Sequence, residues 1–374
     1  MKMEKVFLGK MNAKIIIGAN LGDEGKGTVV ARCVKDCKGK VLNILTNGGA
    51  QRAHSILTEN GSFTFQHFGS GTYHGADNYF SEYYILNPMQ FVKECTDLLS
   101  RNVKIGKVYR NTGCRWSTPY DMMANQIIEQ LRGDNHHGTC GMGIWETVLR
   151  YMKTKTVTLD EFIRMSFEQQ TAYLRTVKGY FETQRLEVPD SWKSVWDNDM
   201  IALHFINDCK FLTDFTEVFD SSELSGYESL VFENGQGLML NDTGKDIQGT
   251  TPSRTDSTYA LEIAKSFGVS DIELHYVTRP YLTRHGKGDL VKECQRWMIA
   301  SSIEKDRTNY YNQFQENFRY APLDLSALRN RIQKDSLGQH KTILEVTHCD
   351  EMDREKEFRQ MFNNVLFTDN AMIK

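Results

Sequence analysis

Short apolar runs recur along the chain, and each is followed by a glycine-rich or polar stretch. The clearest are Ile15–Ile17, Val41–Leu45, Val108–Tyr109, Leu230–Phe232, Ile272–Val277 and Ile343–Val346. Brief apolar runs bounded by turn-forming residues are typical of buried β-strands. We therefore expect each of them to be a strand in the interior of the protein.

Stretches with helical spacing of apolar residues lie between these runs. The clearest are Met122–Leu131, Leu159–Phe181 and Ala260–Phe267. Strands that alternate with helices predict an α/β fold with a mainly parallel central sheet, flanking helices and ligands at the carboxyl ends of the strands. Tyr151–Asp220 has aromatic-rich helical patterns and no strand pattern, which predicts a helical insertion packed on the sheet. We expect one domain over residues 1–374.

Composition narrows the class of protein. The chain has 374 residues, 40% of them hydrophobic, which is enough for a large core, and its net charge of −3 gives no field that attracts nucleic acid or an anionic membrane. No apolar run approaches the length of a membrane-spanning helix, and the N-terminus lacks the apolar core of a signal peptide. Eight scattered cysteines predict free thiols in the cytoplasm.

The most informative segment follows the first predicted strand and reads Gly18-Ala19-Asn20-Leu21-Gly22-Asp23-Glu24-Gly25-Lys26-Gly27-Thr28. Strand, glycine-rich turn and helix form the P-loop-like arrangement in which backbone N–H groups and a helix N-terminus bind phosphate. Lys26 adds a positive charge. The acidic pair Asp23-Glu24 is unfavourable beside phosphate unless a metal ion or a proton transfer needs a carboxylate there. The alternative is that the glycines only form a tight turn.

Further glycine-rich loops follow other predicted strands. Asn47–Ser55 contains Gly48-Gly49 and ends near His54, which can act as a general acid or an electrophile, although a single histidine is more often structural. The others are His67–Gly71, Gly138–Ile144 and Glu233–Leu240, and Gln236 in the last can pair with the edge of a base. Together these loops predict a site that binds more than one phosphate.

In this order, the loops resemble those of the adenylosuccinate synthetase superfamily over most of residues 14–350. Asp23–Gly27 matches its G-D-E-G-K-G signature, and Gly48–Ser55 resembles G-G-x-N-A-G-H-T. The remaining matches are His67–Gly71 to H-x-x-P-S-G, Thr118–Tyr120 to P-Y-H, Gly138–Ile144 to G-T-T-G-R-G-I, Glu233–Leu240 to E-G-A-Q-G-x-x-L, and Tyr281–Gly288 to Y-x-T-R-x-G-x-G.

This resemblance implies a ligase that joins L-aspartate to C6 of an IMP-like purine monophosphate through a 6-phosphoryl intermediate, with GTP as the phosphoryl donor and Mg²⁺ as cofactor. It implies Asp23 as base and metal ligand, His54 as a donor to O6 or to the phosphoryl oxygens, and the carbonyl of Ala53 as a second metal ligand. It places nucleotide-binding groups at Gly22, Glu24, Gly25, Lys26, Gly27, Thr28, Ser55, Arg319 and Asp350, and substrate-binding groups at Gln51, Thr139, Cys140, Arg150, Gln236, Leu240 and Thr255. It also implies a homodimer, in which Arg150 reaches the monophosphate of the partner subunit.

The chain departs from the family pattern at several positions. The C-terminal region is abbreviated, Gln51 and Arg52 replace an asparagine and a small residue of the histidine loop, and most of the arginine run before Leu323-Asp324 is missing. Cys140 and Met142 replace a hydroxyl residue and an arginine. Two alternatives therefore remain. One is a viral-type enzyme that acts on dGMP, which the short frame favours and the retained Asp23 disfavours. The other is a nucleotide-binding sensor without turnover.

Overall fold

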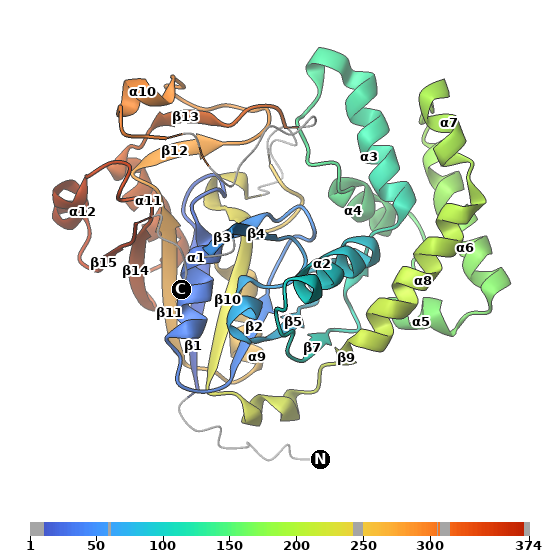
Figure 1. The fold of residues 1–374 in the computed structure, drawn as a ribbon, viewed down its shortest axis with the longest axis horizontal. Coiled ribbons are helices and arrows are strands. Elements are labelled where there is room, and N and C mark those ends of the chain that lie inside the picture. The colour runs from blue at the N-terminus through green and yellow to red at the C-terminus, as the bar shows by residue number, and fades with distance from the viewer. Residues whose placement is uncertain (1–10, 59–60, 242–249, 305, 307–314, 370–374) are drawn as a thin grey trace.

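The computed structural model describes residues 11–58, 61–241, 250–304, 306 and 315–369. Within these residues a nine-stranded sheet forms the centre of the molecule, in the order β15-β14-β11-β1-β10-β2-β5-β7-β9, and all its neighbouring strands pair in parallel (Figure 1). Its strands are β1 (Asn12–Gly18), β2 (Val41–Leu45), β5 (Asp77–Phe80), β7 (Val108–Arg110), β9 (Glu217–Val218), β10 (Ser229–Gly237), β11 (Asp271–Thr278), β14 (Lys341–Val346) and β15 (Val365–Phe367). The predicted α/β fold with a mainly parallel sheet is confirmed.

Every apolar run predicted as a strand lies in this sheet. Each of these runs is buried because parallel strands are covered by helices on both faces. Three strands of the sheet, β5, β9 and β15, were not predicted. They are short, and β5 and β9 begin with acidic residues. Strands of two to four residues are too short to show a period.

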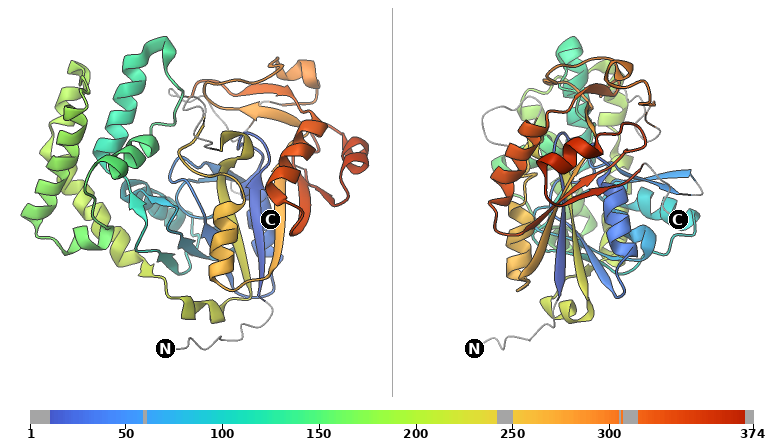
Figure 2. Two further views of the ribbon diagram at one scale, coloured as in Figure 1. Left: turned by 180° about the vertical axis from the view of Figure 1, so that it is seen from behind. Right: turned by 90° about the vertical axis from the view of Figure 1, so that its left-hand side faces the viewer.

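Helices cover both faces of the sheet. The first, α1 (Lys26–Lys35), lies on one face, and α9 (Thr258–Ser266) and α11 (Leu325–Ser336) lie on the other, as the right-hand view of Figure 2 shows. A hydrogen bond from the Tyr276 hydroxyl of β11 to Asp335 Oδ2 of α11, 2.6 Å long, joins the second layer to the sheet. The remaining helices outside the insertion are α2 (Pro88–Ser100), α10 (Arg296–Ile299) and α12 (Glu355–Met361).

The predicted helical region lies beyond β7 and β9 and begins earlier in the chain than expected. Its helices are α3 (Pro119–Arg132), α4 (Ile144–Lys153), α5 (Leu159–Arg164), α6 (Phe167–Thr183), α7 (Asp190–Trp196) and α8 (Asp199–Phe215). Phe162 of α5 and Phe205 of α8 share one buried cluster with Leu45 and Phe80 of the sheet, so the insertion packs on the sheet as predicted.

Two details of that region were predicted wrongly. Leu159–Phe181 is not one helix but two, because Ser166 begins a new helix: its side chain accepts a hydrogen bond from the Gln169 N–H, and the Gln169 side chain accepts one from the Ser166 N–H. In addition, the range 151–220 does contain a strand, since β9 pairs with the end of β7 at the edge of the sheet.

Short paired strands complete the fold. They are the hairpins β3 (His54–Thr58) with β4 (Gly61–Phe65) and β12 (Tyr281–Arg284) with β13 (Arg319–Pro322), and the parallel pair β6 (Ile85–Leu86) with β8 (Arg115–Trp116). Single 3₁₀ turns occur at Ser70–His74, Gly133–Asn135, Ser221–Gly226 and Leu238–Leu240. In the described part of the chain, no helix has the length and apolar character needed to span a bilayer. All eight cysteines are free thiols.

Candidate active site

The predicted phosphate-binding loop connects β1 to α1 as expected. Gly25, the residue before α1, has a φ of 85°, a left-handed conformation that suits glycine. Gly27 lies in the first turn, where a Cβ atom would stand 2.8 Å from the carbonyl oxygen of Ser55 on β3. The N-terminus of α1 can therefore approach β3 closely, and residues of both line one cavity.

The two acidic residues of the loop have different positions. Glu24 is buried, and its Oε1 accepts hydrogen bonds from the backbone N–H groups of Asn20 (3.1 Å) and Gly22 (2.8 Å). Lys26 Nζ lies 3.6 Å from Glu24 Oε2 and donates to the carbonyl oxygen of Gly22 at 2.5 Å. Burial raises the pKa of Glu24, although Lys26 opposes the shift. Glu24 thus shapes the loop from within and does not line a cavity.

Asp23, in contrast, points outward and is held by the segment that contains β12. Its Oδ2 lies 3.3 Å from His285 Nδ1, and its carbonyl oxygen accepts a hydrogen bond from Arg279 Nε at 2.7 Å. Thr283 contacts the same carbonyl oxygen at 3.4 Å. Burial disfavours the carboxylate, but His285, Arg279 and Lys26 outweigh burial and lower the pKa of Asp23. The side chain is therefore an ionised carboxylate at neutral pH.

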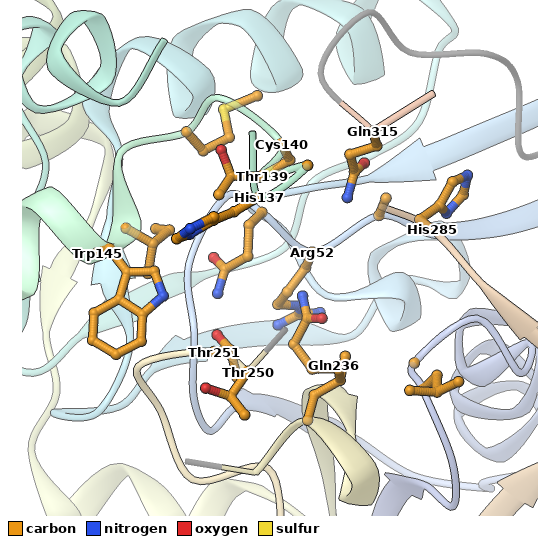
Figure 3. Close-up of a pocket in the computed structure, with 18 of the residues that line it drawn as sticks. Arg52, His137, Thr139, Cys140, Trp145, Gln236, Thr250, Thr251, His285 and Gln315 are labelled. Atoms are coloured by element: carbon orange, nitrogen blue, oxygen red, sulfur yellow. The ribbon is translucent and has the colours of Figure 1, made fainter. Parts of the chain in front are cut away.

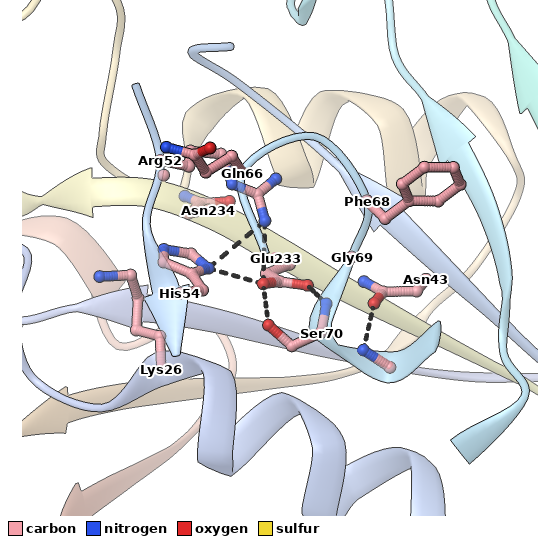
Figure 4. Close-up of polar contacts among 12 residues, drawn as sticks. Lys26, Asn43, Arg52, His54, Gln66, Phe68, Gly69, Ser70, Glu233 and Asn234 are labelled. Carbon is pink, nitrogen blue, oxygen red and sulfur yellow. Dashed lines mark hydrogen bonds and ion pairs between the residues drawn. The ribbon is translucent and has the colours of Figure 1, made fainter. Parts of the chain in front are cut away.

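His54, the first residue of β3, belongs to a buried polar cluster around Glu233 of β10 (Figure 4). Glu233 Oε1 lies 2.6 Å from His54 Nδ1, 2.8 Å from Arg52 Nη2 and 2.7 Å from Ser70 Oγ, and Glu233 Oε2 accepts from the Ser70 N–H at 2.9 Å. A carboxylate only accepts hydrogen bonds, so the short contact places the ring proton of His54 on Nδ1. Nε2 is left as the ring nitrogen for a ligand.

The charges in this cluster determine the protonation state of His54. Burial and the Arg52 cation lower the pKa of His54 to about 4, although Glu233 favours the protonated ring. Burial disfavours ionisation of Glu233, yet Arg52 and His54 lower its pKa to about 2. In the ligand-free protein at pH 7, His54 is therefore neutral and Glu233 is ionised. Donation from Nε2, the role implied by the resemblance, needs a second proton on the ring.

A large cavity and a smaller one meet at these residues. Gly22, Asp23, Ala53 and His54 line both. The large cavity extends from them between the 136–145 segment, the loop after β10 and the loop after β12, and Figure 3 shows Arg52, Gln236, Thr139 and His285 around it. The smaller cavity lies at the N-terminus of α1. A ligand in each cavity would therefore have its reactive end beside Asp23 and His54.

Most of the predicted site residues line one of these cavities. The large cavity is lined by the predicted substrate-binding residues Gln51, Thr139, Cys140, Gln236 and Leu240. The smaller cavity is lined by the predicted nucleotide-binding residues Gly22, Gly25, Lys26, Gly27, Thr28 and Ser55. His348 also lines the smaller cavity.

Arg150 is placed elsewhere, and this corrects the sequence interpretation. Its side chain is fully buried within its own subunit, where Nε and Nη2 donate to the two carboxylate oxygens of Asp121 at 2.8 and 2.9 Å. Nη2 also donates to the carbonyl oxygen of Trp116 at 3.0 Å. A guanidinium bound in this way cannot extend to the nucleotide of a partner subunit.

Three further predicted residues also lie outside the lining of both cavities. The hydroxyl of Thr255 is buried and donates to the Gly237 carbonyl oxygen at 2.8 Å. Arg319 forms an ion pair with Glu293 and donates to the carbonyl oxygens of Gly286 and Gly288, each at 2.9 Å. Asp350 is exposed in the turn after β14. Thr255 and Arg319 thus support the loops that form the site.

Sequence reasoning missed four residues that surround Asp23 and His54, namely Glu233, Arg52, Arg279 and His285. Glu233 and Arg52 stand inside quoted motifs, but nothing in the motifs shows that they contact His54. His285 occupies a position that the Y-x-T-R-x-G-x-G pattern leaves open. An acidic residue directly after the buried apolar run Leu230–Phe232, as Glu233 is, was the available signal, because it must find a partner when buried.

Two buried histidines make stability depend on pH. Burial lowers the pKa of His54 to about 4 and that of His67 to about 3, so the unfolded chain binds protons that the folded chain does not. Each histidine should lower the free energy of unfolding by about 2 kcal/mol between pH 7 and pH 5. Glu94 and Glu146, whose pKa burial raises to about 8 and about 7, act in the opposite direction.

The test therefore compares a variant with the wild type. His67 Nε2 accepts a hydrogen bond from the Asn87 N–H at 3.0 Å, and the glutamine of His67→Gln can replace that acceptor without titrating. Urea denaturation should show that His67→Gln gains about 2 kcal/mol relative to wild type when the pH falls from 7 to 5. A stability difference that is the same at both pH values would contradict the assignment of a neutral buried ring.

The oxygen atoms at the junction of the cavities suit a magnesium ion. Asp23 and Ala53 line both cavities and supply a carboxylate and a carbonyl. Among the described residues no group of three or more His, Cys, Asp or Glu side chains could hold a metal. Mg²⁺ commonly takes only one or two protein oxygens and fills its remaining positions with phosphate and water, so this donor set fits it.

Comparison with known proteins identifies the family. The sequence model of the adenylosuccinate synthetase family matches residues 15–360. The adenylosuccinate synthetase of *Psychrobacter arcticus* is 26% identical over 294 residues, which cover 75% of this chain and 64% of that enzyme. The enzyme of *Hamiltonella defensa* is 25% identical over 338 residues, covering 87% of this chain and 74% of that enzyme. The chain thus spans slightly less than two thirds of the length of the *P. arcticus* relative.

Solved structures share the fold. The fully ligated adenylosuccinate synthetase of *Plasmodium falciparum* matches with a TM-score of 0.71 at 17% identity, over 93% of this chain and 78% of that one. The succinoaminodeoxyadenylate synthetase of cyanophage S-2L, solved with dGMP and dATP, matches with a TM-score of 0.64 at 11% identity, over 96% and 91% of the two chains. The matched family model spans nearly the whole described sheet and the loops that form both cavities. This chain belongs to the adenylosuccinate synthetase family.

Proposed function

We propose that this protein is a ligase that joins the amino group of L-aspartate to C6 of an IMP-like purine nucleoside monophosphate, with GTP as the phosphoryl donor. One observation carries the proposal: the large cavity and the cavity at the N-terminus of α1 meet at Asp23 and His54. A purine in the first and a triphosphate in the second would present O6 to the terminal phosphorus. Family membership makes this the expected chemistry of such an arrangement.

In the first step Asp23 takes the N1 proton of the purine, and the electrons of that bond increase the charge on O6. O6 then forms a bond to the terminal phosphorus, and the bond from this phosphorus to the β–γ bridging oxygen breaks, which releases the nucleoside diphosphate. His285, Arg279 and Lys26 lower the pKa of Asp23, so the side chain is an ionised carboxylate at neutral pH, the form that can accept a proton. Catalysis then depends mainly on positioning and on neutralising charge.

In the second step the aspartate nitrogen attacks C6, and the phosphate on O6 leaves. The amino nitrogen loses a proton, so the products are the succinylated purine nucleotide, the diphosphate and inorganic phosphate. Phosphorylation matters because an amide-like oxygen is otherwise a poor leaving group. Arg284 and Lys287 line the large cavity, and Asp23 is the one carboxylate among the described residues of its lining. The cationic side chains in the lining thus outnumber the carboxylate, which suits the anionic ligands of this reaction, the purine monophosphate and aspartate.

Asp23 and the Ala53 carbonyl would hold a magnesium ion, and the ion would neutralise negative charge on the phosphates. We propose that His54 gains its second proton when these phosphates enter, because their charge offsets the effect of Arg52 on the ring. Its Nε2 then donates to O6 or to the transferred phosphoryl oxygens. Lys26 and the N–H groups of the α1 turn would bind the phosphate chain of the donor.

We further propose that the protein is one domain, works in the cytoplasm and forms a homodimer. The one nine-stranded sheet at the centre of the described residues supports the first point, and the free thiols support the second. Family membership supports the third. The dimer does not depend on Arg150, whose guanidinium is engaged within its own subunit.

The test is a panel of purine monophosphates (IMP, GMP and dGMP) with GTP or ATP, Mg²⁺ and aspartate, followed by mass spectrometry of the products. We expect a succinylated nucleotide with IMP and GTP. A preference for dGMP would support the viral-type alternative and contradict the IMP-like substrate. Nucleotide binding without any product would contradict the proposed ligase function and support the alternative of a nucleotide-binding sensor without turnover.

A further inference from the structure

Arg52 is a buried arginine that the proposed chemistry does not use directly. Its side chain is fully buried beside the large cavity, and Nη2 forms an ion pair with Glu233 Oε1 at 2.8 Å. The same oxygen accepts the Nδ1–H of His54. Nη2 also lies 3.3 Å from His54 Nδ1, so the guanidinium touches both members of the pair.

The Arg52 side chain is held in place on more than one side. A Cβ atom on Gly235 would stand 3.0 Å from Arg52 Cγ and 3.2 Å from Cδ, so the arginine stem packs closely against the backbone of residue 235. The guanidinium carbon lies 5.8 Å from the ring centroid of Tyr84. Gly235 is itself fixed by a 2.8 Å hydrogen bond from its N–H to Asn47 Oδ1.

The ion pair determines where Glu233 can stand. A buried carboxylate such as that of Glu233 needs both a counter-charge and hydrogen-bond donors. Arg52 supplies the permanent charge, and Ser70 supplies two donors, its backbone N–H and its side-chain O–H. Without Arg52 the carboxylate would be free to shift or to take up a proton, and His54 would lose its defined acceptor.

We propose that Arg52 is a positioning residue for His54: it fixes Glu233, and Glu233 holds the ring so that Nε2 faces the junction of the cavities. This inference rests on the proposed ligase function for its kinetic readout. It goes beyond that function because it gives Arg52 a role that acts through Glu233.

The kinetic test uses Arg52→Met, which keeps the length of the stem and removes the charge. We expect kcat for ligation to fall about 10- to 100-fold, with KM for IMP and GTP within about twofold of wild type. Arg52→Lys, which restores the charge without the planar fork, should recover part of kcat. Unchanged kcat, or a loss confined to KM, would overturn the proposal.

A matched control separates positioning from general destabilisation. Arg110 on β7 is also buried and pairs with one carboxylate, Asp160, through Nη2 at 2.6 Å. Arg110→Met should lower the denaturation midpoint as Arg52→Met does but leave kcat of the folded enzyme unchanged. If both variants lose kcat in proportion to their stability, Arg52 has no positioning role.

A second readout does not require activity. In ¹⁵N-labelled protein the His54 Nδ1 proton should give a low-field resonance, assigned by its absence in His54→Gln. That resonance should shift or disappear in Arg52→Met and stay unchanged in Arg110→Met. If the His54 resonance persists unchanged in Arg52→Met, the proposal is overturned, even if the wild type ligates no aspartate. If the resonance is lost in Arg52→Met and the wild type is inactive, the positioning role stands and the ligase function is wrong.

Discussion

The Asp23→Asn variant is expected to lose at least about 10²-fold in kcat, with much less effect on the affinity for the triphosphate. An amide has the size of the carboxylate but cannot take up the N1 proton of the purine. The loop itself should survive, because Arg279 holds Asp23 through the main-chain oxygen, at 2.7 Å, and not through the side chain. Steady-state kinetics with IMP, GTP and aspartate, together with equilibrium binding of a non-hydrolysable GTP analogue, measure the two effects.

Glu24→Gln is the matched control for this experiment. Glu24 is the neighbour of Asp23, but its carboxylate accepts backbone N–H groups inside the loop and lines neither cavity. The change should therefore weaken triphosphate binding or stability more than the chemical step. Equal losses of kcat and affinity in Asp23→Asn would show that Asp23 only shapes the loop, and the proposed proton transfer would then be wrong.

The central sheet and the phosphate loop could be predicted because their causes are local. A strand buried on both faces is mostly apolar, as β1 is at Ile15–Ile17, and a loop that presents N–H groups to phosphate needs glycines at close approaches such as Gly27. The opposite positions of Asp23 and Glu24 could not be predicted. Both are carboxylates in one loop, and only the three-dimensional turn decides that Glu24 faces the N–H groups of Asn20 and Gly22.

The cluster around His54 was beyond sequence reasoning for a different reason. His54 and Glu233 are far apart in the chain and meet only because β10 lies between β1 and β2 in the sheet. A motif records which residues occur in each loop, but strand order decides which loops become neighbours. The same holds for Asp23 and His285, which the loop after β12 brings together. Contacts of this kind follow from topology and not from local pattern.

Arg150 shows how a resemblance can mislead, and its substitution gives the second large expected effect. Arg150→Met should lower the free energy of unfolding by about 3–5 kcal/mol, because it leaves the fully buried carboxylate of Asp121 without its counter-charge. Arg175→Met, on the exposed surface of α6, should change it by less than about 0.5 kcal/mol. Urea denaturation of both variants measures this difference.

Kinetics then distinguish the structural role from the role that the resemblance implied. If Arg150 only pairs with Asp121, KM for IMP in the folded variant should stay within about twofold of wild type. A residue that bound the monophosphate of a partner subunit would instead raise KM and leave stability nearly unchanged. Adding Asp121→Asn to Arg150→Met should recover part of the lost stability, because it removes the unpaired charge, whereas a ligand-binding arginine would show no such coupling with Asp121.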